Sequence, residues 1–135
     1  MSDELKKVLA SIEESVEYLG IELRDVNQRG QFGNTPLKVA SVRGDVDAVR
    51  VLLISGAEIN AVVEDGFTAL HHAAGQGHLD VVRFLLKHGA LTDVENDDGQ
   101  TPAALAKILG NVEVLRLLES DSESPATNRG RQGRR

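Results

Sequence analysis

One fixed spacing, the step from Gly33 to Gly66 and from Gly66 to Gly99, organises most of this chain. Glycine and threonine recur at this interval in three copies, and a Gly-Ala pair recurs in two. A period held across several residue types is an internal repeat. A repeat of this length indicates units that cannot bury their apolar faces alone and must stack on one another. The recurring residues are Gly33, Gly66, Gly99; Thr35, Thr68, Thr101; Gly44, Gly77, Gly110; and the pairs Gly56-Ala57 and Gly89-Ala90.

Each copy is predicted to hold two helices joined by a turn, followed by an extended loop or hairpin. In the central copy, the Thr68 hydroxyl is expected to accept from the free N–H groups at the start of the first helix. Gly77 is expected to end that helix, because glycine accepts positive φ without strain. His78 follows, as Asp45 and Asn111 do in the other copies, and each is expected to cap the second helix. The second helix keeps helical apolar spacing at Leu79, Val82, Leu85 and Leu86, and the Asp-Gly pairs at 65–66 and 98–99 predict turns.

The central copy, GFTALHHAAGQGHLDVVRFLLKHGA at 66–90, resembles an ankyrin repeat, and residues 33–40 and 99–106 resemble the same part of neighbouring repeats. The resemblance covers about residues 25–119. Lys38 and Ala104 stand where the family pattern has histidine, and Ala69 stands where it has proline. The resemblance implies an all-α ankyrin-repeat solenoid of stacked helix-turn-helix units with hairpin loops. Its expected parts are a helical capping unit at 1–29, repeats at 30–62 and 63–95, a truncated repeat at 96–119, and a disordered tail at 120–135.

Residues 4–19 are predicted to form one amphipathic helix. Val16 and Leu19 lie one repeat interval before Val49 and Leu52, so this helix is expected to fill the second-helix position of an incomplete first unit. A cap on the end of the stack is the favoured interpretation, and a helix that docks on a partner is the alternative. The predicted apolar stripe is Leu5, Val8, Leu9, Ile12, Val16 and Leu19, and the residues predicted to face water are Lys6, Lys7, Glu13, Glu14 and Glu17.

The formal net charge is −6, and it is unevenly distributed. Four arginines and two acids give the segment 120–135 a charge of +2, so the segment 1–119 carries −8. An acidic body repels phosphate backbones and acidic lipids, so neither nucleic acid nor membrane is an expected partner. It favours a protein partner with a basic surface. A nucleic-acid contact through the arginine tail is the rival hypothesis, and a solvated end is the favoured one.

Targeting signals and chemical motifs are sparse. No apolar run approaches the roughly 18 residues that a membrane span needs, and the acidic N-terminus is unlike a signal peptide, so a cytoplasmic location is expected. The chain has no cysteine. None of its histidines forms a helical metal pair with another, and residues 96–99 lack the ligand pattern of a calcium loop. We therefore expect no catalytic residue, cofactor or metal. A rival hypothesis is an enzyme or small-ligand protein that uses His71, His72 and Asp98.

The resemblance also implies how the chain acts. Ankyrin-like stacks bind proteins through the hairpin tips and the exposed side of the first helices, and the family's histidine, here His71, bonds the backbone of a neighbouring loop. The predicted function is a non-catalytic protein–protein interaction module that acts as an adaptor or inhibitor and is a monomer when free. A bacterial immunity protein that occludes a toxin active site is the alternative. Phe32, Phe67 and five acids are expected to lie exposed along the tips. The predicted partner-binding residues are Gln31, Phe32, Asn34, Val42, Arg43, Glu64, Asp65, Phe67, Gln76, Glu95, Asp97, Asp98, Gln100, Ile108 and Leu109.

Overall fold

The computed structural model describes residues 1–122, with side chains up to residue 120. These residues form seven α-helices and two short 3-10 turns, and no β-strand occurs among them. The predicted all-α fold is therefore confirmed. The helices are α1 (Asp3–Glu13), α2 (Pro36–Arg43), α3 (Val46–Ile54), α4 (Ala69–Gln76), α5 (Leu79–Lys87), α6 (Pro102–Ile108) and α7 (Val112–Ser122), and the 3-10 turns are η1 (Val16–Tyr18) and η2 (Glu64–Gly66).

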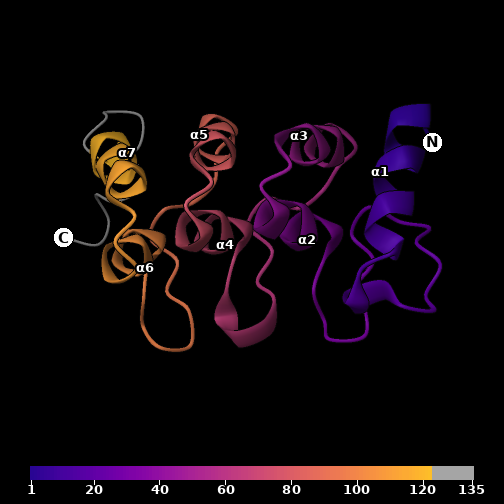
Figure 1. Ribbon diagram of the computed structural model, residues 1–135, viewed down its shortest axis with the longest axis horizontal. Helices are drawn as coiled ribbons and strands as arrows, with labels where there is room; N and C mark the ends of the chain where they lie inside the picture. The colour runs from indigo at the N-terminus through magenta and orange to yellow at the C-terminus, as the bar shows by residue number, and fades with distance from the viewer. Residues whose placement is uncertain (123–135) are drawn as a thin grey trace.

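The helices stand in two rows along the molecule (Figure 1). One row contains α2, α4 and α6, the other contains α3, α5 and α7, and loops project beyond the first row. Neighbouring helices within each row are in contact, so each helical pair packs on the pair before it. α1 stands across the N-terminal end and contacts both α2 and α3. This arrangement is the stacked solenoid that the repeat predicted. None of the helices in residues 1–122 has both the length and the apolar character needed to cross a bilayer.

The first helix of each pair begins at the predicted threonine. The hydroxyls of Thr35, Thr68 and Thr101 accept from the backbone N–H three residues later, at 3.2, 3.3 and 3.1 Å. Each bond satisfies one of the donors that a helix start leaves free. Gly44 and Gly77 end α2 and α4 with φ of 73° and 75°, a left-handed conformation that favours glycine.

The residue after this glycine behaves differently from copy to copy. Asp45 caps α3 as predicted, because its carboxylate accepts from the N–H of Ala48 at 3.0 Å. The prediction is wrong for His78, which makes no side-chain cap; its Nε2 lies 2.9 Å from the carbonyl of Val42 at the end of α2. Asn111 likewise donates from Nδ2 to the carbonyls of Ala74 and Gly75, at 2.8 and 2.9 Å. Both side chains carry a nitrogen that can donate, unlike the Asp45 carboxylate, so they bond carbonyls that the end of the first helix in the preceding repeat leaves free.

The core consists of aliphatic and small side chains at the repeat interval. Leu52, Leu85 and Leu118 occupy the same position in successive units and are at most 2% exposed. Ala40, Ala73 and Ala106 keep the same interval in the first row and are at most 1% exposed. Small residues at these positions allow neighbouring helices to approach closely, so one continuous core runs through the stack.

The N-terminal segment differs from its prediction. α1 ends at Glu13 instead of continuing to residue 19, and Val16 and Leu19 are 69% and 70% exposed instead of lying on an apolar stripe. Tyr18 takes their place in the core at 0% exposure, and its hydroxyl donates to the carbonyls of Gln28 and Asn34 at 2.6 and 3.0 Å. Because this ring must enter the core, the chain leaves the helix and turns through η1. α1 still packs on α3, although the alignment of Val16 and Leu19 with the repeat is wrong.

The C-terminal prediction is only partly testable. Glu119 stands at the repeat position of Leu53 and Leu86, which are half-buried, and it is exposed. The tail was predicted to begin at residue 120, but α7 continues to Ser122, which is four residues beyond the buried Leu118. The remainder of that prediction, at 123–135, lies outside the described residues.

Candidate protein-binding surface

Three hairpin tips lie side by side at one edge of the solenoid (Figure 1). Each is closed by a backbone N–H···O bond of 2.8–2.9 Å, from residue 30 to 34, 63 to 67 and 96 to 100. The N–H of Asp97 also donates to the carbonyl of Asp65 at 3.0 Å, so the second and third tips are joined directly. Most of the predicted partner-binding residues are exposed on the tips or at the ends of the first-row helices: Gln31, Phe32, Arg43, Glu64, Asp65, Gln76, Glu95, Asp97, Asp98, Ile108 and Leu109.

Four predicted residues are less accessible. Val42, Phe67 and Gln100 are half-buried. Asn34 is 1% exposed, so its prediction as a contact residue is wrong. Its Nδ2 donates to Glu17 at 2.8 Å, and its Oδ1 accepts from the N–H of Glu64 at 3.3 Å. Asn34 therefore joins the first tip to the second, and it acts on the surface by positioning both.

Glu17 was predicted to lie on the water-facing side of a helix, and this prediction is wrong. Glu17 is 6% exposed, and its carboxylate accepts from the N–H groups of Phe32 and Asn34, at 2.9 and 3.1 Å, and from Nδ2 of Asn34. Gly30 packs so closely that a Cβ there would lie 2.5 Å from the carboxylate. Burial, with the Glu17 charge nearby, raises the pKa of Tyr18. Glu17 and Tyr18 together fix the first tip.

The two tip phenylalanines differ in exposure. Phe32 is 53% exposed, which confirms the prediction that this ring lies exposed. Phe67 is half-buried, because its ring packs beside two histidine rings, with centroids 5.4 Å from His71 and 4.8 Å from His72. Of the two rings that were predicted to be exposed, only Phe32 is therefore exposed. The sequence could not show that the two rings differ in exposure, since both stand in loops next to a glycine.

Charge is graded along the three tips. The segment 29–34 contains Arg29 and no acid, 62–67 contains two acids, and 95–100 contains three. All five carboxylates are on exposed residues. We call them the acidic tips: Glu64, Asp65, Glu95, Asp97 and Asp98. Basic groups on a partner are attracted to such a row before contact, and this attraction is weakened by salt.

A hollow of about 330 Å³ lies beside the first tip, and five of the predicted partner-binding residues line it. Val39 and Val42 of α2 contribute aliphatic side chains to it, and Val16 of η1 and the Phe32 ring line it from the other segments. Glu64 reaches it from the second tip. The hollow could not be predicted, because it depends on η1 replacing the end of the expected helix. We call it the anchor hollow; its predicted members are Phe32, Asn34, Val42, Arg43 and Glu64.

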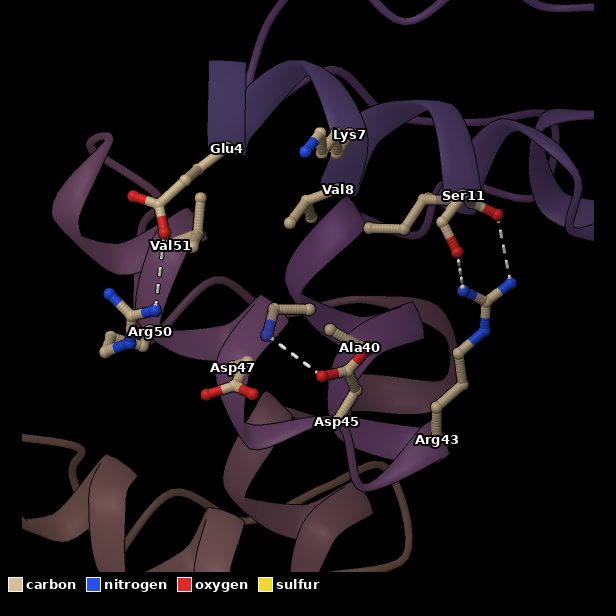
Figure 2. A pocket seen from close by; sticks show the side chains of 12 residues that line it. Glu4, Lys7, Val8, Ser11, Ala40, Arg43, Asp45, Asp47, Arg50 and Val51 are labelled. Carbon is tan, nitrogen blue, oxygen red and sulfur yellow. Dashed lines mark hydrogen bonds and ion pairs between the residues drawn. The ribbon is translucent and has the colours of Figure 1, made fainter. Parts of the chain in front are cut away.

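A second hollow, of about 430 Å³, lies between α1 and the α2–α3 turn (Figure 2). At one end Arg43 donates to the hydroxyl and carbonyl of Ser11, at 3.1 and 3.3 Å, and at the other Arg50 lies 3.6 Å from Glu4. These contacts hold α1 across the groove. Acids and bases are equal in number around it, so it has no clear charge preference: Glu4, Asp45 and Asp47 oppose Lys7, Arg43 and Arg50.

The histidines act within the fold. His71 accepts from the N–H of Thr68 at Nδ1, 3.1 Å away, and its Nε2 lies 2.8 Å from the carbonyl of Gln100 in the next hairpin. The predicted bond to a neighbouring loop is therefore present, and burial lowers the pKa of His71. The Nε2 atom of His72 is buried and has no partner in the described part of the chain. Burial, with the charges of Lys38 and His71, lowers the pKa of His72 to about 4. Among the described residues, no three His, Asp or Glu side chains are grouped as a metal ion would require.

Comparison with known proteins agrees with this architecture. A family model described as ankyrin repeats (many copies) matches residues 37–86 and 73–119, which together make up more than half of the chain. A search of curated proteins finds no match. Members of this family generally mediate protein–protein interaction. The repeat spacing, the stacked helical pairs and the family match lead to one conclusion: this chain belongs to the ankyrin repeat family.

Proposed function

We propose that the chain is a non-catalytic module that binds a protein with a basic surface through its hairpin tips and the adjoining ends of the first-row helices. The acidic tips carry this proposal, because five exposed carboxylates on neighbouring loops attract complementary positive charge. The hydrogen bonds that close and join these loops support it. A surface that is ordered before binding avoids part of the entropy cost of association.

The finer proposal is that the module acts as an adaptor or an inhibitor and is monomeric when free. An inhibitor with these tips would cover a basic active or binding site, and a bacterial immunity protein that occludes a toxin is one form of it. An adaptor would bind a basic surface away from any active site. An inhibition assay on the captured partner distinguishes the two roles, since only an inhibitor lowers the partner's activity at saturating concentration.

The test compares two variants with the same change in charge. The tip variant is Glu64→Gln, Asp97→Asn and Asp98→Asn. The control variant neutralises exposed acids at equivalent positions of the three second-row helices: Asp47→Asn, Asp80→Asn and Glu113→Gln. Both variants are used with the wild type for capture from a native lysate, quantified by mass spectrometry at low and physiological salt.

The tip variant is expected to lose the captured partner, and the control variant to retain it. Salt is expected to weaken capture by the wild type more than capture by the tip variant, because fewer charges remain to be screened. Equal capture by both variants would exclude the tips as the binding surface. Melting curves of both variants show whether a loss of capture reflects unfolding.

A further inference from the structure

The anchor hollow has a mixed lining, in which an apolar group of three valines and Phe32 lies beside charged residues that include Lys38, Arg43 and Glu64. Val39 is 8% exposed and Val42 is half-buried, whereas Val16 and Phe32 at the opening are 69% and 53% exposed. Its volume of about 330 Å³ is near the lower end of the roughly 300–1,000 Å³ of small-molecule sites. The apolar part of this lining can receive an aliphatic side chain of a partner, because burying that side chain also covers the rim residues.

The walls of the hollow are fixed before any partner arrives. The Glu17 carboxylate accepts from the backbone N–H groups of Phe32 and Asn34, and these bonds hold the backbone of the first tip in place. Arg43, at the end of α2, donates to Ser11 of α1 and holds the helix end in place. Segments that are already ordered lose little entropy on binding, so the hollow can contribute affinity that a mobile loop would lose.

Charge at the hollow itself is mixed, because Lys38 and Arg43 line it together with Glu17 and Glu64, and acids predominate only on the next two tips. Glu64 stands at its rim, and Asp65 lies beside Glu64 on the same tip. The backbone bond from Asp97 to Asp65 continues the row of acids to the third tip. The first tip has no acid and carries Arg29, so attraction for a basic residue begins at the second tip and increases toward the third.

We infer that the anchor hollow receives an aliphatic side chain from an extended segment of the partner, and that basic residues of the same segment lie over the second and third tips. This inference rests on the proposed function and specifies the chemistry of the partner. Packed helices stand about 8–10 Å apart, and an extended chain advances about 3.3 Å per residue. One repeat therefore corresponds to about three residues of the partner. The expected pattern is an aliphatic residue with Lys or Arg about three and six positions away.

Synthetic peptides of this pattern test the inference. The probe is Ac-Gly-Leu-Gly-Ser-Lys-Gly-Ser-Lys-Gly-amide with a fluorescent label, together with the same sequence in reverse order. One control replaces the leucine by serine, and another replaces both lysines by glutamine. Binding to the full chain is measured by fluorescence anisotropy at low salt. The better of the two leucine peptides is expected to bind at least about tenfold more tightly than its serine control, which is the advantage of burying one aliphatic side chain.

Matched protein variants locate the effect. Val16→Ser and Phe32→Ser are expected to remove the advantage of leucine over serine, because both residues line the hollow. Leu19→Ser is the control: Leu19 is 70% exposed, close in sequence to Val16, and does not line the hollow. Because the three side chains are exposed, the variants are expected to fold, and melting curves check this.

The outcomes separate this inference from the proposed function. Equal binding of the leucine and serine peptides would overturn the inference that the hollow receives an aliphatic side chain. The inference would also be overturned if Leu19→Ser and Val16→Ser reduced the advantage of the leucine peptide equally. If lysine-dependent binding persists in that case and is lost in the tip variant, the proposed function stands without it. Failure of every peptide to bind also overturns the anchor, whereas the proposed function fails only if the tip variant still captures the partner from lysate.

Discussion

The imidazole of His71 connects two repeats: its Nε2 lies 2.8 Å from the backbone carbonyl of Gln100, the last residue of the third hairpin. The same carbonyl accepts from the N–H of Asn96, so one oxygen closes the hairpin and fastens it to α4. The equivalent position of the preceding repeat holds Lys38, and the described part of the chain has no such bond there. The contact between α2 and the second hairpin therefore lacks a hydrogen bond that the contact between α4 and the third hairpin has. This difference can be tested.

Lys38→His is expected to stabilise the protein by about 1 kcal/mol, the typical net value of a well-placed buried hydrogen bond. The new ring would have the hydroxyl of Thr35 beside it and the carbonyl of Phe67 in the place that Gln100 has for His71. Chemical denaturation of the variant and the wild type measures the change. His71→Ala is the opposite control and is expected to destabilise. A Lys38→His variant no more stable than the wild type would show that the two junctions are not equivalent.

Acid is expected to destabilise the fold through His72. Its pKa is about 4 in the folded chain, and an unfolded histidine titrates near 6.5. Between these values the unfolded chain binds a proton that the folded chain does not, so stability is lost as pH falls from about 6.5 to 4. The loss attributable to His72 is up to about 3 kcal/mol. His71, whose pKa is also lowered, adds to the loss in the same direction.

His72→Leu separates the two contributions. Leucine occupies the equivalent position 105, so the side chain suits the fold, and the substitution removes the buried Nε2 that has no partner. Denaturation curves from pH 4 to 7 are expected to show a shallower fall for the variant than for the wild type. Parallel curves for the two proteins would mean that His72 is not protonated on unfolding in this range.

The buried hydroxyl of Ser41 is a defect in the core. Ser41 is 0% exposed and its Oγ has no partner among the described residues, whereas the equivalent residue of the next repeat is Ala74, also 0% exposed. Ser41→Ala is expected to stabilise by about 1 kcal/mol, because an unpaired buried polar group costs about 1–3 kcal/mol. The reciprocal change, Ala74→Ser, is expected to destabilise by a similar amount. Thermal and chemical unfolding of both variants measure the two changes in stability. Changes of the same sign would contradict this explanation.

Glu17→Gln is expected to destabilise by about 2–3 kcal/mol. The carboxylate accepts from three N–H donors, and glutamine would turn a donor group toward one of them in a buried site. Glu14→Gln is the control, since Glu14 is exposed and such surface changes are usually within about 0.5 kcal/mol. Hydrogen exchange is expected to show faster exchange at the N–H groups of Phe32 and Asn34 in the Glu17 variant. Equal stability of the two variants would exclude Glu17 as the support of the first tip.

Features that depend on local chemistry could be predicted from the amino-acid sequence alone. Thr35, Thr68 and Thr101 start helices because a hydroxyl can accept from the N–H three residues on, and Gly44 and Gly77 end them because they accept positive φ. These interactions span only a few residues, so their pattern is visible without the fold. Most of the tip residues could also be predicted, because the repeat assigns each of them a position on the same edge.

The packing of the N-terminal segment against the first repeat could not be predicted in this way. Residues 14–19 have helical spacing, but burying Tyr18 and pairing Glu17 with the first tip is more favourable than continuing the helix. This choice exposes Val16 and Leu19, buries Asn34 and forms the anchor hollow. These contacts join segments that are far apart in the sequence, so neither segment alone shows which residues of the other it will contact.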